Sequence, residues 1–165
     1  DIKALNLHYC THPNCPFKRI CYNYGYQDPD NCHLCKCIDG FMGAQCEQFK
    51  KRQRKCSKEL ILPDRMPRYF ILQGKKKCVM HFVVNRTSKI RFVIIKVHML
   101  PNTYPTCQYE NTIEVKYWMD KSVTGARFCR QTDSKIILSH NNHIIYHYRS
   151  TQENNFAKIY YSEIY

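Results

Sequence analysis

One stretch decides the fold of the first part of this chain: Cys32-His33-Leu34-Cys35-Lys36-Cys37-Ile38-Asp39-Gly40-Phe41-Met42-Gly43-Ala44-Gln45-Cys46. It holds four cysteines, and the last two bracket a Gly-aromatic-x-Gly turn. A segment so short cannot bury an apolar core, so either crosslinks or a bound metal must hold it. Because disulfides persist outside the cell and are rare in the cytosol, this choice also determines the compartment.

The eleven cysteines are unevenly distributed along the sequence. Seven lie between Cys10 and Cys46, and the rest are spread over a longer segment, at Cys56, Cys78, Cys107 and Cys129. This distribution favours two disulfide-bonded extracellular modules. The alternative is a zinc site built from Cys32, Cys35, Cys37 and His33. Zinc is less favoured, because the chain has no second Cys-x-x-Cys at finger spacing.

The number of cysteines is odd, and the sequence begins at Asp1 without an initiator Met or a recognisable signal peptide. A secreted chain with an odd cysteine either bonds to another chain or has lost its partner by truncation. No run of about eighteen apolar residues occurs, so we expect no membrane insertion. These features predict a fragment of a longer secreted protein. A complete small protein with a free thiol is the alternative.

The formal net charge is +13, from 26 Lys and Arg against 13 Asp and Glu. Such an excess favours polyanions: nucleic acid, glycosaminoglycan or an acidic membrane surface. If the cysteines form disulfides, nucleic acid is the least favoured of these. The cations concentrate in residues 47–55, which we interpret as a basic linker. The candidates for polyanion binding are Lys50, Lys51, Arg52, Arg54 and Lys55. The same run also fits a solvated linker or a site of proteolytic separation.

From Cys56 onward, runs of β-branched and aromatic residues alternate with polar turns. They predict strands at residues 68–72, 78–84, 90–97, 112–118, 135–138, 144–148 and 156–161. Strands in this number, without a helical period, predict an antiparallel β-sandwich. The chain is therefore expected to be mainly β, with a small disulfide-rich module before the sandwich. The sequon Asn85-Arg86-Thr87 falls at a predicted strand end, which makes Asn85 a candidate glycosylation site.

The spacing of six cysteines resembles that of an EGF-like domain over residues 11–46. One residue separates the fourth from the fifth, and eight residues containing Gly40-Phe41-x-Gly43 separate the fifth from the sixth. Sequence alone permits fifteen pairings. The resemblance implies the pairs Cys15–Cys32, Cys21–Cys35 and Cys37–Cys46. Calcium-binding members of the family carry acidic residues before the first cysteine. Residues 11–14 offer no carboxylate, so no calcium is expected here.

Residues 56–165 resemble a CUB domain, because two cysteine pairs lie within a strand-rich unit. The stretch from Thr112 to Cys129 is similar to the nematode version of that domain. The resemblance implies the pairs Cys56–Cys78 and Cys107–Cys129. Many CUB domains bind calcium through acidic residues that include a Tyr-Asp after the third cysteine. Here that position reads Tyr109-Glu110, so a calcium site stays open.

Residues 1–10 resemble the end of an astacin-type catalytic domain, whose last cysteine bonds to an early cysteine of the same domain. Cys10 would be that residue, unpaired in this chain. An astacin tail, an EGF-like module and a CUB domain, in this order, resemble the C-terminal half of a nematode astacin zinc metalloendopeptidase.

Astacins bind zinc through His-Glu-x-x-His-x-x-Gly-x-x-His, and no His-Glu pair occurs in this sequence. We therefore expect no catalytic residue, metal ligand or cofactor in this chain, with zinc bound by the missing catalytic domain. The nearest similar segment contains His140, His143 and His147 in an Ile-rich setting. We interpret these residues as part of a β-hairpin that turns at Asn141-Asn142.

The resemblance implies a secreted, non-catalytic region that recognises protein substrate or extracellular matrix, with a glycosaminoglycan as a further candidate partner. Nucleic acid and membrane insertion are not expected. The first alternative is a stand-alone secreted EGF–CUB protein that binds glycosaminoglycan or matrix proteins. The second is an intracellular zinc-thiolate protein that binds nucleic acid.

Overall fold

A computed structural model describes residues 2–9, 15–51, 53–102 and 105–165 of the chain. It contains two compact units: one comprises residues 1–51 together with 120–124, and the other comprises residues 52–119 and 125–165. The change of unit after Lys51 falls inside the segment predicted as a basic linker. Cys10, residues 11–14 and Arg52, which carry part of the sequence predictions, lie outside the described residues.

The described residues of the first unit form one short helix and two very small antiparallel sheets. The helix α1 spans Ile2–Tyr9, β1 (Tyr26–Gln27) pairs with β2 (Cys35–Lys36), and β3 (Phe41–Met42) pairs with β4 (Gln48–Phe49). Disulfides join Cys15 to Cys32, Cys21 to Cys35 and Cys37 to Cys46, which are the pairs implied by the EGF resemblance.

Little apolar surface is buried in this first unit. Phe41 and Cys46 are its buried apolar side chains among the described residues, and Phe41 stacks on Phe49 with ring centroids 5.6 Å apart. The turn between β3 and β4 needs Gly43, because its φ of 101° is in a region that residues with a Cβ rarely adopt. Crosslinks therefore supply most of the stability that a core would otherwise provide.

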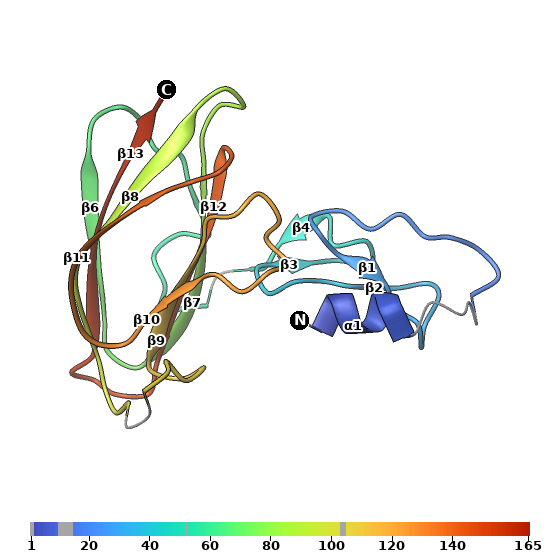
Figure 1. Ribbon diagram of the computed structural model, residues 1–165, viewed down its shortest axis with the longest axis horizontal. Helices are drawn as coiled ribbons and strands as arrows, with labels where there is room; N and C mark the ends of the chain where they lie inside the picture. Colours follow the sequence, from blue (N-terminus) through green and yellow to red (C-terminus); the bar gives the residue numbers. More distant parts are fainter. Residues whose placement is uncertain (1, 10–14, 52, 103–104) are drawn as a thin grey trace. The chain divides into compact units, whose positions relative to one another are not determined.

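The second unit is a sandwich of a five-stranded and a four-stranded sheet. The five-stranded sheet has the order β10 (Ala126–Phe128), β9 (Thr112–Lys116), β12 (His143–Ser150), β7 (Lys76–Val83) and β5 (Leu60–Ile61). The four-stranded sheet has the order β11 (Arg130–Leu138), β8 (Lys89–Met99), β13 (Phe156–Ile164) and β6 (Arg68–Gln73). Figure 1 shows these as the two layers of the sandwich.

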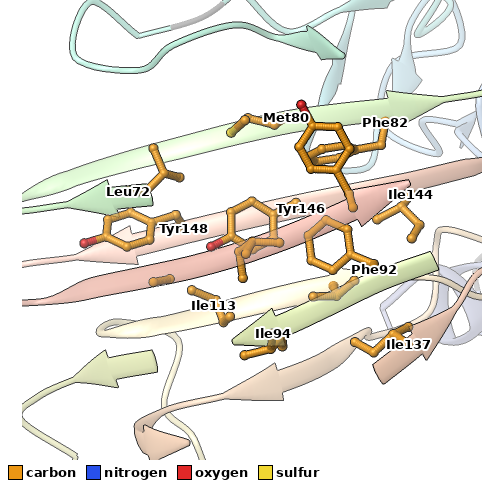
Figure 2. Close-up of a cluster of buried hydrophobic side chains, with 14 of the residues drawn as sticks. Leu72, Met80, Phe82, Phe92, Ile94, Ile113, Ile137, Ile144, Tyr146 and Tyr148 are labelled. Carbon is orange, nitrogen blue, oxygen red and sulfur yellow. The ribbon is translucent and has the colours of Figure 1, made fainter. Parts of the chain in front are cut away.

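The hydrophobic core lies between the two sheets (Figure 2). The ring of Phe82 on β7 lies 5.2 Å from that of Phe92 on β8, so aromatic contacts join the layers. Tyr148 is also buried, and its hydroxyl lies within hydrogen-bonding distance of the backbone oxygens of Gly74 and Asn155, at 3.1 and 3.0 Å. The hydroxyl of Tyr146 is buried without a hydrogen-bond partner among the described residues. Burial raises the pKa of Tyr146 well above its usual value.

All seven strands predicted in this unit are present, and the fold class is confirmed. Two short strands, β5 and β10, were not predicted, because two or three residues carry no readable alternation. The prediction of a hairpin at Asn141-Asn142 is wrong. The preceding strand β11 belongs to the four-stranded sheet and β12 to the five-stranded sheet, so this connection crosses between layers. The apolar run Ile144-Ile145 pairs with β7 instead, which explains the crossing.

Candidate binding surfaces

The basic run at residues 50–55 is only partly free to bind an anion. The ammonium group of Lys50 lies 2.9 Å from a carboxylate oxygen of Asp39, so its charge is already matched. Lys51, Arg54 and Lys55 are exposed. Arg52 lies outside the described residues.

A second basic run, residues 75–77, lies beside the end of the first. The disulfide between Cys56 and Cys78 brings the two runs together, with Cα atoms 5.7 Å apart. The Nζ atom of Lys76 donates to the backbone oxygen of Lys55 at 3.4 Å. Two cationic segments that are separated by some twenty residues in sequence are therefore adjacent. We call Arg54, Lys55 and Lys76 the basic corner.

A buried carboxylate, Glu114 on β9, is surrounded by cations of the five-stranded sheet. Its oxygens lie 3.0 Å from Arg149, 3.7 Å from Lys116 and 3.7 Å from Arg127. The backbone N–H of Gly125 also donates to it at 2.9 Å. Burial alone raises the pKa of Glu114, but this N–H, the charge of Lys116 and the bond from Arg149 lower the pKa to about 2. A carboxylate held ionised in this way cannot serve as a general acid near neutral pH.

The histidines of the candidate zinc-like segment do not gather into a metal site. Residues His143 and His147 would be one turn apart on a helix, but on the strand β12 they are about 13 Å apart along the chain. The Nδ1 atom of His81 lies 3.0 Å from Nε2 of His143 instead. The described part of the chain contains no group of three or more His, Cys, Asp or Glu side chains that fits a metal ion. These residues do not fit a catalytic zinc.

Cations lie beside the residues at the position where many CUB domains bind calcium. The guanidinium carbon of Arg149 lies 4.2 Å from the ring centre of Tyr109. The Nζ atom of Lys77 lies 3.7 Å from the carboxylate of Glu110. Because these positive charges lie beside Tyr109 and Glu110, they reduce the attraction of the Glu110 carboxylate for a calcium ion.

The second pair of cysteines, Cys107 and Cys129, is joined by a disulfide with Cα atoms 5.6 Å apart. Both pairs implied by the CUB resemblance are thus present in the structure. The sequon residue Asn85 is exposed in the turn between β7 and β8. Its backbone oxygen accepts a hydrogen bond from the N–H of Ser88 at 3.0 Å.

Among the described residues no helix is long and apolar enough to span a bilayer. No protein-family model matches the chain. Its sequence is 34% identical over 137 residues to "Zinc metalloproteinase nas-23" of Caenorhabditis elegans, which covers 78% of this chain and 25% of that protein. It is 32% identical over 131 residues to "Zinc metalloproteinase nas-30" of the same organism, covering 78% of this chain and 17% of that protein. The chain thus spans a quarter or less of the length of these relatives.

Among solved structures, the chain resembles the "CUB1-EGF-CUB2 domain of HUMAN MASP-1/3", with a TM-score of 0.50 and 15% sequence identity. The match covers 88% of this chain and 55% of that structure. At this identity the likeness shows the fold alone. The fold is that of EGF-like and CUB modules.

Proposed function

We propose that this chain, whose homologues over most of its length are astacin-type zinc metalloproteinases, is the non-catalytic part of such an enzyme that recognises protein substrate or extracellular matrix. One observation carries the proposal: the similarity covers most of this chain but only a quarter or less of each of these relatives. The remainder of such a parent protein has room for a separate catalytic domain, which would bind the zinc.

The described residues support a binding role rather than a chemical one. The histidines do not form a zinc site, and the buried carboxylate Glu114 is held ionised by cations. Five disulfides favour an extracellular location, because such bonds are reduced in the cytosol. A binding module linked to a protease raises the effective concentration of substrate at the active site, without a new contact to the scissile bond.

The test compares the parent protease with a variant that ends at residue 10 and therefore lacks residues 11–165. Both would be assayed on a short peptide that contains only the cleavage site and on a matrix protein that contains the same sequence. We expect kcat/KM for the peptide to change less than twofold, and kcat/KM for the matrix protein to fall at least tenfold in the truncated enzyme. Equal kcat/KM values for both enzymes on the matrix protein would contradict the proposal.

The basic corner supports a second candidate function, the binding of a sulfated glycosaminoglycan. The observation in favour is the contact between Lys76 and Lys55 beside the disulfide, which concentrates cations from two segments. Clustered cations gain affinity for a polyanion by releasing condensed counterions, so the binding weakens as salt rises.

Heparin chromatography tests this candidate. The double variant Arg54→Ser, Lys76→Ser should elute at a lower salt concentration than the unmodified chain. The matched control is Lys18→Ser, Arg86→Ser, which removes the same charge at exposed residues outside the basic corner and outside the four-stranded sheet. Equal elution of the two double variants would show that heparin responds to net charge only, which removes the basic corner as a site.

A further inference from the structure

The four-stranded sheet of the CUB unit carries an apolar row that crosses all four strands. Ile136 on β11 lies opposite Val93 on β8, Val93 lies opposite Tyr160 on β13, and Tyr160 lies opposite Tyr69 on β6. Residues directly opposite one another project from the same face of a sheet. With strands about 4.8 Å apart, the row is about 14 Å wide.

This row faces away from the core. The residues next to it along the strands, Ile137, Phe92, Ile159 and Phe70, pack into the core, so alternation directs the row outward. At the two edges, 59% of Ile136 and 67% of Tyr69 remain exposed. Exposed apolar side chains that form a continuous band mark interaction sites more often than isolated ones do.

Cations lie on both sides of the apolar row. On one side Lys96 lies opposite Lys158, and on the other side Arg91 lies opposite Ser162. Lys96 also lies opposite Asp133, which partly offsets its charge. Each side lies two residues from the apolar row along β13, which is about 6.7 Å, so Arg91 and the Lys96–Lys158 pair are about 13 Å apart. We call the apolar row with Arg91, Lys96 and Lys158 the outer sheet face.

We propose that the outer sheet face is the surface with which this region docks its polypeptide partner, and that the partner is a segment in which apolar side chains are flanked by Asp or Glu. The inference deepens the proposed function and rests on it. Charge complementarity identifies the partner: the face combines aromatic and aliphatic area with cations, and the whole chain carries a net charge of +13. Tyrosine, here Tyr69 and Tyr160, is one of the side chains enriched among the residues that dominate binding energy at interfaces.

A selection from a random peptide library, with the full 165-residue chain as bait, tests the inference. We expect enriched peptides to combine apolar residues with Asp or Glu. Their Kd should rise at least tenfold for the double variant Arg91→Glu, Lys158→Glu. The second of these substitutions places a carboxylate opposite Lys96, so it creates no like-charged pair across the two strands. The control, Lys58→Glu with Arg86→Glu, makes the same change in net charge at exposed residues outside the face and should bind within twofold of the unmodified chain.

Three outcomes would overturn the inference: no enrichment, enriched peptides without acidic residues, or an equal loss of affinity in both double variants. A second variant, Tyr160→Ser, tests the apolar part and should weaken binding without changing net charge. Protease assays separate this inference from the proposed function. If truncation lowers kcat/KM on matrix protein but Arg91→Glu, Lys158→Glu in the parent does not, the region recognises substrate through another surface.

Discussion

The buried charge cluster around Glu114 gives the sharpest prediction for stability. Replacing Glu114 with Gln keeps the size of the side chain but removes the charge that matches Arg149. Both side chains are nearly inaccessible to solvent, at 3% and 6% exposure. A buried cation that loses its partner is costly, typically by about 3–5 kcal/mol.

The effect should depend on pH in a defined direction. The pKa of Glu114 is about 2 in the folded chain, against an ordinary value of 4.5. Because the folded pKa is lowered, the stabilisation is fully present above pH 4.5 and is lost as the pH falls towards 2. Each pKa unit corresponds to about 1.4 kcal/mol, so the carboxylate contributes about 3 kcal/mol at pH 7 and about 1 kcal/mol at pH 3.

Urea unfolding at pH 7, 4.5 and 3, with the disulfides intact, measures how the contribution of Glu114 to the free energy of unfolding depends on pH. We expect Glu114→Gln to lower the free energy of unfolding by about 3 kcal/mol at pH 7, with the difference from the unmodified chain shrinking at pH 3. The matched control is Glu110→Gln, which removes an exposed partner of Lys77 and should cost less than about 1 kcal/mol. A difference for Glu114→Gln that stays constant between pH 7 and 3 would refute the reasoning.

Three further predictions concern the core, the EGF-like unit and the surface. Tyr148→Phe removes a hydroxyl that lies near two acceptors, and it should lower the free energy of unfolding in denaturant by about 1–2 kcal/mol. Tyr146→Phe removes a hydroxyl without a described partner, so it should leave that free energy unchanged or raise it. Equal effects of the two substitutions would contradict these contacts. Gly25→Ala places a Cβ 2.7 Å from Sγ of Cys46 in the EGF-like unit, so dithiothreitol should reduce the disulfides of this unit faster. Mass spectrometry measures the rate of reduction, and an unchanged rate would contradict the prediction. Asn85→Gln should abolish the mass loss on treatment of the secreted protein with an N-glycosidase, and no mass loss from the unmodified protein would show that the sequon is empty.

The sequence predicted the parts of this fold that depend on local spacing. Cysteine intervals identified the EGF-like module, and runs such as residues 90–97 identified the strands, because both signals lie within one short segment. The pairing between strands depends on partners far apart in the chain. The parallel pairing of β5 with β7 and the crossing after Leu138 left no local signal.

The candidate surfaces were less predictable for the same reason. Residues Lys55 and Lys76 become neighbours through a disulfide whose pairing the sequence alone left open. Glu114 and Arg149 meet only when β9 and β12 take their observed register. A shift of one residue in that register would reverse the faces on which their side chains lie. The outer sheet face likewise requires four strands to align, so no single strand indicates it.

The basic corner and the outer sheet face should respond differently to salt, although both are cationic. A site made of lysine and arginine alone gains affinity from counterion release, so the logarithm of its binding constant for heparin should fall linearly with the logarithm of the salt concentration. A site with Tyr69 and Ile136 exposed among its cations keeps an apolar contribution that salt does not screen. The apolar contribution should leave measurable affinity for an acidic, apolar peptide at a salt concentration that abolishes heparin binding. If both affinities vanish at the same salt concentration, the peptide is held by charge alone, and the apolar row has no part in its binding.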